Sequence, residues 1–224
     1  MRSILRPIKC RSSLLFISLI LPLLAGGCIS SKSVLNRYYL IELEEPGPSA
    51  AENDENRAPL IDMTCEIAEI EVGSLIDRSQ IINRSRSHEI TYYQSHLWAT
   101  RPSVAFADVM LRQIEGSGLF RGVSDRYSRS LPDLRLWSAI RHLEVVEDNG
   151  EFMAHLSMEF TLVRIRDNQV MVKHSFDRTE PLEKRDLNLF AQKISQILSD
   201  ELNLLIAILK EEAPDIQETS DDSD

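Results

Sequence analysis

The sequence predicts an α+β fold: a two-layer sandwich in which one mixed, mainly antiparallel sheet carries two helices packed on it. Three observations lead to this prediction. Extended, β-rich segments stand both before and after an amphipathic helix that opens at Pro102. Asn149-Gly150, the strongest short hairpin signal, joins two long segments of alternating polarity. A longer amphipathic helix, from Asp186 to about Glu211, closes the domain.

The first half of the chain predicts several strands separated by polar segments. The expected strands are residues 37–43, 60–72, 80–83 and 89–93. Residues 44–59 are polar, carry Pro and Gly, and predict a flexible loop. In the second strand the apolar parity changes near Ile67, which a β-bulge would explain. Cys65 falls on an apolar position and is expected in the core, with a reactive thiol as the alternative.

The first helix is expected to begin with Pro102 in its first turn and to end at Gly116 and Gly118. Its apolar positions define one expected buried face with two neighbours beside it. The face is Val104, Ala107, Leu111 and Ile114, with Phe106 and Met110 beside it. A short strand over residues 119–124 should follow.

The second half predicts a β-meander followed by the closing helix. The expected strands are residues 133–146, 151–165 and 170–177. The middle strand alternates without a break from Phe152 to Leu162, so one of its faces should be buried. Asp186 is the expected N-cap of the last helix. We expect this helix to lie on the sheet, and the alternative is that its end also packs on a partner. Residues 212–224 are acidic and are expected to form a disordered tail after Pro214.

Composition fits one soluble globular domain over residues 37–211, preceded by a targeting segment. The chain has 224 residues, 43% hydrophobic and 27% charged. Residues 1–27 combine a basic start, an apolar run too short to span a bilayer and small residues, which is the layout of a signal peptide. Losing their four basic residues changes the net charge from −10 to −14. So acidic a chain argues against nucleic acid as a partner.

Cys28 stands directly after Gly26-Gly27 and predicts a lipoprotein. Cleavage before Cys28 would leave it as the first residue, carrying diacylglycerol and an N-acyl chain such as palmitate, with residues 28–36 as a tether. Ile29, where an Asp would signal retention, favours the outer membrane. The match is imperfect because Ala25 stands where Leu is usual. Ordinary signal peptidase cleavage, leaving a soluble protein with a free Cys28, is the alternative.

No motif predicts chemistry, so the sequence indicates a protein that is not an enzyme. His88 begins an H-E-x-x sequence that lacks the second histidine of a zinc site. Three histidines, His142, His155 and His174, lie on consecutive predicted strands. His155 is out of phase with the apolar positions and should face solvent, whereas His174 is in phase and should face the core. We therefore predict no catalytic residue, no metal site and no cofactor beyond the lipid on Cys28.

Three segments resemble the PqiC-like family of ABC-type transport auxiliary lipoproteins. They are RYYL at 37–40, EIEVGSLIDRSQIINR at 69–84 and LWATRP at 97–102. With the strands and helix that follow, the resemblance covers roughly residues 24 to 210. It implies a fold similar to the TolB N-terminal domain. The positions that match the family pattern are the expected partner-binding residues Tyr38, Tyr39, Asp77, Arg78, Trp98 and Pro102.

The resemblance also implies a role and a place for the protein. Such lipoproteins face the periplasm, anchored in the inner leaflet of the outer membrane, and support lipid movement beside an MCE-domain protein and an ABC transporter. Some form homo-oligomeric rings. The expected function is therefore a non-catalytic scaffold of an intermembrane phospholipid transport system. An outer-membrane assembly or chaperone lipoprotein, and a cell-envelope hydrolase, are the alternatives.

Overall fold

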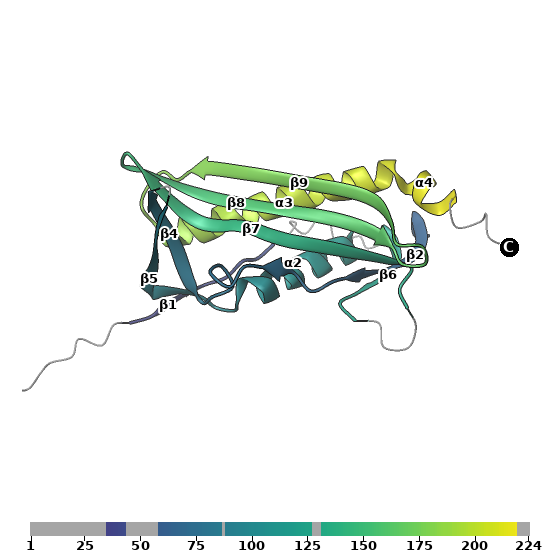
Figure 1. Cartoon of the computed structure of the whole chain (residues 1–224), viewed down its shortest axis with the longest axis horizontal. Helices are drawn as coiled ribbons and strands as arrows, with labels where there is room; N and C mark the ends of the chain where they lie inside the picture. The colour runs from purple at the N-terminus through teal and green to yellow at the C-terminus, as the bar shows by residue number, and fades with distance from the viewer. Residues whose placement is uncertain (1–34, 44–57, 87, 127–130, 219–224) are drawn as a thin grey trace, which may run out of the picture. The chain divides into compact units, whose positions relative to one another are not determined.

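The longest strands of the sheet form a meander of β7 (Leu134–Asp148), β8 (Glu151–Arg164) and β9 (Gln169–Pro181) (Figure 1). The computed structural model describes residues 35–43, 58–86, 88–126 and 131–218. The predicted signal peptide, Cys28, most of the tether and most of the 44–59 loop lie outside these ranges. Asn149 and Gly150, with φ of 49° and 86°, form the predicted turn between β7 and β8.

The other edge of β7 pairs in succession with short parallel strands from the first half of the chain. These are β2 (Ile61–Ile67), β3 (Glu71–Val72) and β4 (Gln80–Arg86). The sheet then extends through β5, antiparallel to β4, and through β1 and β6, which pair in parallel with β5 and β2. Their bounds are β1 (Arg37–Tyr39), β5 (Glu89–Trp98) and β6 (Phe120–Ser124). The described strands therefore form one mixed sheet, as predicted.

The predicted single strand over residues 60–72 is two strands. The parity change is real, because Ile67 and Ala68 are both buried although they are neighbours. The amide of Ala68 donates to the carbonyl of Leu136 at 3.0 Å, so the chain stays beside β7 while its pairing is interrupted before β3. The bulge predicted near Ile67 is confirmed, because Ile67 pairs with Leu136 and Glu71 with Ala139, so that the three residues 68–70 stand opposite only two residues of β7. The register of the β2–β6 pair also shifts, between Ile61 and Thr64.

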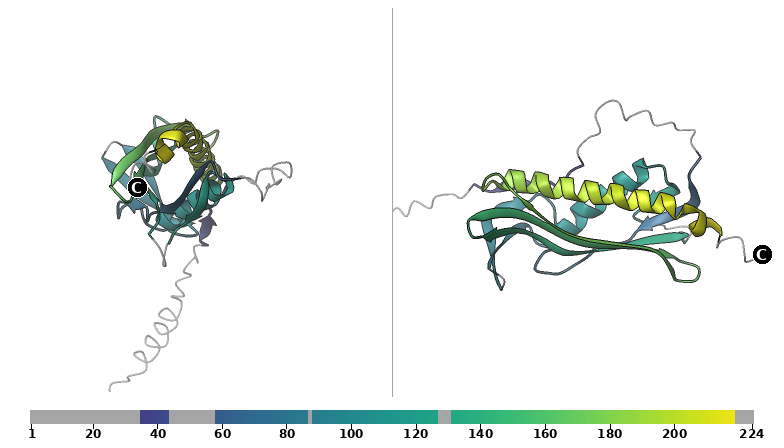
Figure 2. Two further views of the ribbon diagram at one scale, coloured as in Figure 1. Left: turned by 90° about the vertical axis from the view of Figure 1, so that its right-hand side faces the viewer. Right: turned by 90° about the horizontal axis from the view of Figure 1, so that it is seen from above.

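Helices α2 (Pro102–Gly116) and α3 (Leu187–Glu211) lie on the same side of the sheet (Figure 2). Asp186 caps α3 as predicted, because its side chain accepts from the amide of Asn188. The core between helices and sheet includes Phe106, Phe160 and Phe190, all fully buried. Cys65 is a core residue too, and burial raises the pKa of its thiol to about 12, so the thiol stays protonated.

The face of α2 that enters the core differs from the predicted one. The buried positions are Pro102, Phe106, Val109, Met110 and Ile114. Val104, expected in the core, is 56% exposed, and Ala107 and Leu111 are only partly buried. The helix carries two apolar stripes, and the stripe with the larger side chains, Phe106 and Met110, is the one that packs on the sheet.

The predicted disordered tail is wrong for its first part. A short helix, α4 (Ala213–Glu218), follows α3 directly. Pro214 ends α3 as expected, but its fixed φ also suits the first turn of the new helix. Ile216 is fully buried, and the side chain of Gln217 donates to the carbonyl of Leu60 at 2.9 Å. Within the described ranges, the structure has no helix with the length and apolarity needed to cross a membrane.

Candidate functional site

The three segments that carry the family resemblance meet at the start of α2. Tyr39 of β1 pairs with Trp98 at the end of β5, and the amide of Ala99 donates to the carbonyl of Tyr39 at 2.8 Å. The amide of Trp98 donates to the carbonyl of Ser79 at 2.6 Å. Residues far apart in the sequence therefore build one junction, which sets where α2 begins.

Asp77 completes the N-terminus of α2 from outside the helix. The N-cap residue Arg101 makes no side-chain capping bond. Instead, Oδ1 of Asp77 accepts from the amide of Ser103 at 3.1 Å, and Oδ2 lies 3.7 Å from Nη1 of Arg101. The first amides of a helix have no partner within it, so a carboxylate from another segment satisfies one of them. Asp77 thus ties the 73–78 turn to α2.

The predicted partner-binding residues divide into internal and exposed ones. Trp98 is buried against Phe190, with ring centroids 5.7 Å apart, and Pro102 is also buried. The hydroxyl of half-buried Tyr39 is hydrogen-bonded to Nδ1 of His96 at 2.7 Å. These side chains and Asp77 make contacts within the junction that stabilise the fold. Contact with a partner stays a prediction, and Tyr38 and Arg78 are the two whose side chains are exposed.

An open groove of about 730 Å³ lies beside α2, and we call it the α2 groove. Its apolar surface comes from Val104, Ala107 and Leu111 of α2 and from Trp137 of β7, which is 48% exposed. β6 follows β2 only as far as the pair of Glu66 with Ser124. The groove therefore opens beside residues 66–70, where β6 no longer pairs with the edge of the sheet. Charged side chains surround it: Glu66, Glu69, Asp108, Asp125, Arg126 and Arg135.

A second groove, of about 450 Å³, separates the segment after β1 from the first half of α3. Tyr38 and Leu40 line it on one side and Ala191 on the other. Both Tyr38 and Leu40 are more than half exposed. Tyr38, the exposed aromatic residue of the family segment, therefore borders a hollow of the surface.

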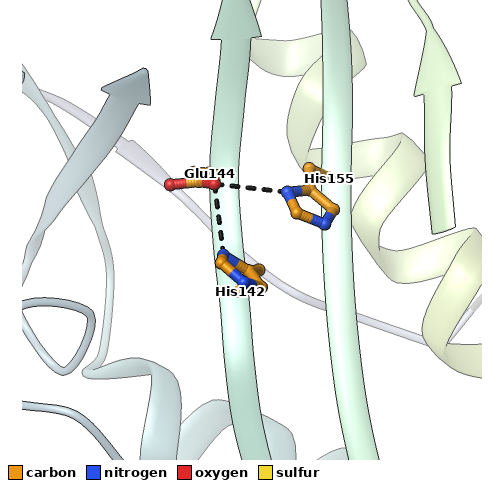
Figure 3. Close-up of side chains that lie close together, drawn as sticks. All are labelled: His142, Glu144 and His155. Carbon is orange, nitrogen blue, oxygen red and sulfur yellow. Dashed lines mark hydrogen bonds and ion pairs between the residues drawn. The ribbon is translucent and has the colours of Figure 1, made fainter. Parts of the chain in front are cut away.

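A charged cluster lies on the face of the sheet opposite α2 and α3, which we call the helix-free face because no helix of the described residues packs on it (Figure 3). Glu144 of β7 is nearly inaccessible there, and Arg84 of β4 donates to both of its carboxylate oxygens at 2.8 Å. Nδ1 of His142 and Nδ1 of His155 lie 3.3 and 3.2 Å from Oε1 of Glu144. On its other side, His155 is hydrogen-bonded through Nε2 to Asp177 of β9 at 2.8 Å.

The environment of this cluster perturbs its acid–base groups. Burial acts to raise the pKa of Glu144, but hydrogen bonds from His155 and Arg84 and the nearby positive charges outweigh it and hold that pKa at about 2. Burial acts to lower the pKa of His155, and the hydrogen bonds and charges of Glu144 and Asp177 raise it overall. The carboxylate is therefore ionised throughout the physiological range.

The three histidines considered from sequence do not converge. His142 and His155 stack with ring centroids 4.6 Å apart on the helix-free face. The predicted face is right for His155, but its side chain is only 14% exposed and does not lie open to solvent. His174 is directed toward α3, where Nε2 bonds Glu201 at 3.0 Å. Glu144 was not among the residues predicted from the sequence. Counting outward from the Asn149-Gly150 turn places Glu144 opposite His155, so the signal was present. Nothing local in the sequence brings Arg84 there.

A family model for the ABC-type transport auxiliary lipoprotein component matches residues 39–203. The chain belongs to this family. The match runs from Tyr39 in β1 to Asn203 in α3, so it includes the junction, the α2 groove and the whole β7–β9 meander. Membership makes the chain a transport auxiliary component associated with the cell envelope. No curated protein matched the chain.

Solved structures support the family's fold. The XCC0632 protein of Xanthomonas campestris, a DUF330 family protein, is 20% identical with a TM-score of 0.64, covering 80% of this chain and 98% of that one. An uncharacterized protein is 11% identical with a TM-score of 0.61, covering 78% and 99%. At these identities the likeness shows the fold of the auxiliary lipoprotein and nothing of its partners.

Proposed function

We propose that the chain is the lipid-anchored, periplasmic subunit of an MCE/ABC-type intermembrane phospholipid transport system and acts as a non-catalytic docking component. Family membership supports association with an ABC transport system. The proposed docking to a partner protein rests chiefly on the α2 groove. In that groove the predicted apolar face of a helix is left open, with Val104 and Trp137 about half exposed. Open apolar surface of this kind is typical of protein-binding sites.

The charges around the α2 groove favour one kind of occupant. Its carboxylates outnumber its basic side chains, and Arg135 is already paired with Glu66 at 2.5 Å. The mature chain is expected to be strongly acidic as a whole. A complementary partner surface is an apolar projection flanked by lysines or arginines. We assign this occupant to the MCE-domain protein, and a ring of copies of this chain is a separate outcome of the test.

The proposed mechanism is positioning rather than chemistry. Lipid on Cys28 would hold the chain at the inner leaflet of the outer membrane, and two or three acyl chains give a stable anchor. The tether of residues 28–36 spans at most about 30 Å when extended. The domain would therefore stay close to the membrane surface while its α2 groove engages the MCE protein, which fixes the end of the transport complex near the acceptor bilayer.

The anchor is tested by labelling cells with a palmitate analogue and comparing the wild type with Cys28→Ser. We expect label and membrane association in the wild type alone. Equal, unlabelled and soluble products would contradict the anchor and favour ordinary signal peptidase cleavage, without bearing on the α2 groove.

The docking role is tested by co-purification after gentle solubilisation. Val104→Glu places a charge among the carboxylates of the α2 groove and should abolish recovery of the MCE protein. Leu204→Glu on α3 is the matched control, because Leu204 is also about half exposed but lies outside the α2 groove. Recovery of a barrel protein in place of the MCE protein would favour the assembly-lipoprotein alternative, and equal recovery from both variants would contradict the groove.

A further inference from the structure

The cluster on the helix-free face brings together groups that all accept a proton or a metal. Asp177 accepts a hydrogen bond from Nε2 of His155, which places the proton of the neutral ring on that nitrogen. Nδ1 of the same ring faces Oε1 of Glu144 at 3.2 Å. In the protonated ring Nδ1 donates to this oxygen, and in the neutral ring Nδ1 carries a lone pair. The neutral ring and the carboxylate are then two acceptors with room between them for a positive centre, and a metal ion can take the place of the proton.

Nδ1 of His142 faces the same oxygen at 3.3 Å, and the three atoms all lie within 4.8 Å of one another. Ligand atoms bound to zinc at about 2.0–2.1 Å in a tetrahedral arrangement are separated by about 3.3 Å. The two nitrogen–oxygen separations already match this value. We propose that His142, Glu144 and His155 bind a divalent transition-metal ion of the Zn²⁺ type.

The ligand set selects the class of metal. Two imidazole nitrogens and one carboxylate oxygen suit Zn²⁺, Ni²⁺ and Cu²⁺, whereas Mg²⁺ and Ca²⁺ prefer sites made of oxygens alone. His142 is 42% exposed on its side chain, so an ion has access from solvent and an open position for water remains. The rings of His142 and His155 are stacked at an interplanar angle of 19°, so the exposed His142 ring would rotate on binding to direct its lone pair to the shared position.

The neighbours of the ligands fit a metal site of moderate affinity. A carboxylate that accepts from the remote nitrogen of a ligating histidine is the usual second partner in zinc sites, and Asp177 has that place on His155. Arg84 fixes the plane of the Glu144 carboxylate through both oxygens. Its positive charge opposes the ion, so the site should exchange metal rather than hold it permanently.

The test is calorimetric titration of the purified full-length chain, without a histidine tag, with Zn²⁺ and in parallel with Mg²⁺. We expect one saturable Zn²⁺ equivalent and no Mg²⁺ binding. His142→Ala and His155→Ala should each weaken the affinity at least tenfold, and Asp177→Asn tenfold to a hundredfold. Glu159→Gln is the control, because Glu159 lies four residues from His155 on the same face and is outside the cluster.

Retained thermal unfolding and circular dichroism identify the variants that keep the fold. His142→Ala is the decisive one, since its exposed side chain can be removed without opening the core. Absence of saturable Zn²⁺ binding by the wild type, or unchanged affinity in folded His142→Ala, would overturn the proposal and leave the cluster as an ion-pair network.

Discussion

The two faces of the β7–β8 hairpin are held by different forces. On the face covered by α3, Leu156, Met158 and Phe160 alternate along β8 and are essentially inaccessible. On the opposite face, the intervening residues are polar, and His155 and Glu159 contact charged side chains from other strands. Alternation within one strand decides the first face. The second depends on which strands lie beside β8 and in what register, so the two opposite faces of one hairpin are predictable to different extents.

The largest effect should come from the covered face. Phe160→Ala removes a fully buried ring and leaves a cavity, so the free energy of unfolding should fall by about 3–5 kcal/mol. Urea denaturation measures the change. Thr161→Ala, one residue further along β8 and facing the other way, is the control and should cost less than about 1 kcal/mol. Similar losses from both variants would mean that the helix-free face is packed as tightly as the covered one.

A smaller loss is expected from the charged cluster. Glu144→Gln leaves Arg84 without its carboxylate at a site where the Glu144 side chain is only 4% exposed. Because Arg84 is itself partly exposed, we expect the free energy of unfolding to fall by about 1–3 kcal/mol. Adding Arg84→Met should cost less than the sum of the two single changes, since the pair acts together. Strict additivity would show that the pair contributes nothing as a unit.

Acid should remove the contribution of Glu144. Its pKa is about 2 in the folded state against 4.5 ordinarily, with Arg84, His142 and His155 facing it. The stabilisation is therefore present above pH 4.5 and is lost as the pH falls toward about 2. His155 behaves oppositely: its pKa is raised, so its contribution is present below 6.5 and lost as the pH rises through the raised value.

Urea midpoints of the wild type and Glu144→Gln, measured across this range, check the acid limb. The difference between them should shrink as the pH falls from 4.5 toward about 2. A difference that stays constant over the range would contradict the assigned pKa of Glu144.

The smallest effect is expected at an exposed pair on the same face. Glu159 lies 3.0 Å from Arg141, and both side chains are about half exposed. Glu159→Gln should leave the urea midpoint unchanged, because exposed ion pairs are screened by water and salt. A loss comparable with that of Glu144→Gln would show that burial does not distinguish the two carboxylates.

Features that a single segment determines by itself were predictable from the sequence. The Asn149-Gly150 turn, the alternation of β8 and the N-cap Asp186 are local signals, and the structure confirms each. The pairing of Glu144 with His155 also follows from the turn, since two-residue hairpins fix the register. The position of Glu144 opposite His155 could therefore have been predicted from the sequence.

The features that could not be predicted depend on contacts between segments that lie far apart in the sequence. Arg84 reaches Glu144 because β4 lies parallel to β7, and no local pattern fixes the register of strands 60 residues apart. The orientation of α2 depends on which of its two apolar stripes packs on the sheet. α4 forms because Ile216 finds a buried site after Pro214 ends the longer helix. Cross-strand and helix–sheet packing settle these features.

Site-specific photo-crosslinking in cells tests the proposed docking role most directly. A photoreactive side chain at position 104, in the α2 groove, is compared with one at position 204, on an exposed part of α3. We expect a crosslink to the MCE-domain protein from position 104 and none from position 204. Crosslinks to that protein from position 204 alone, or to a different envelope protein from position 104, would contradict the docking role.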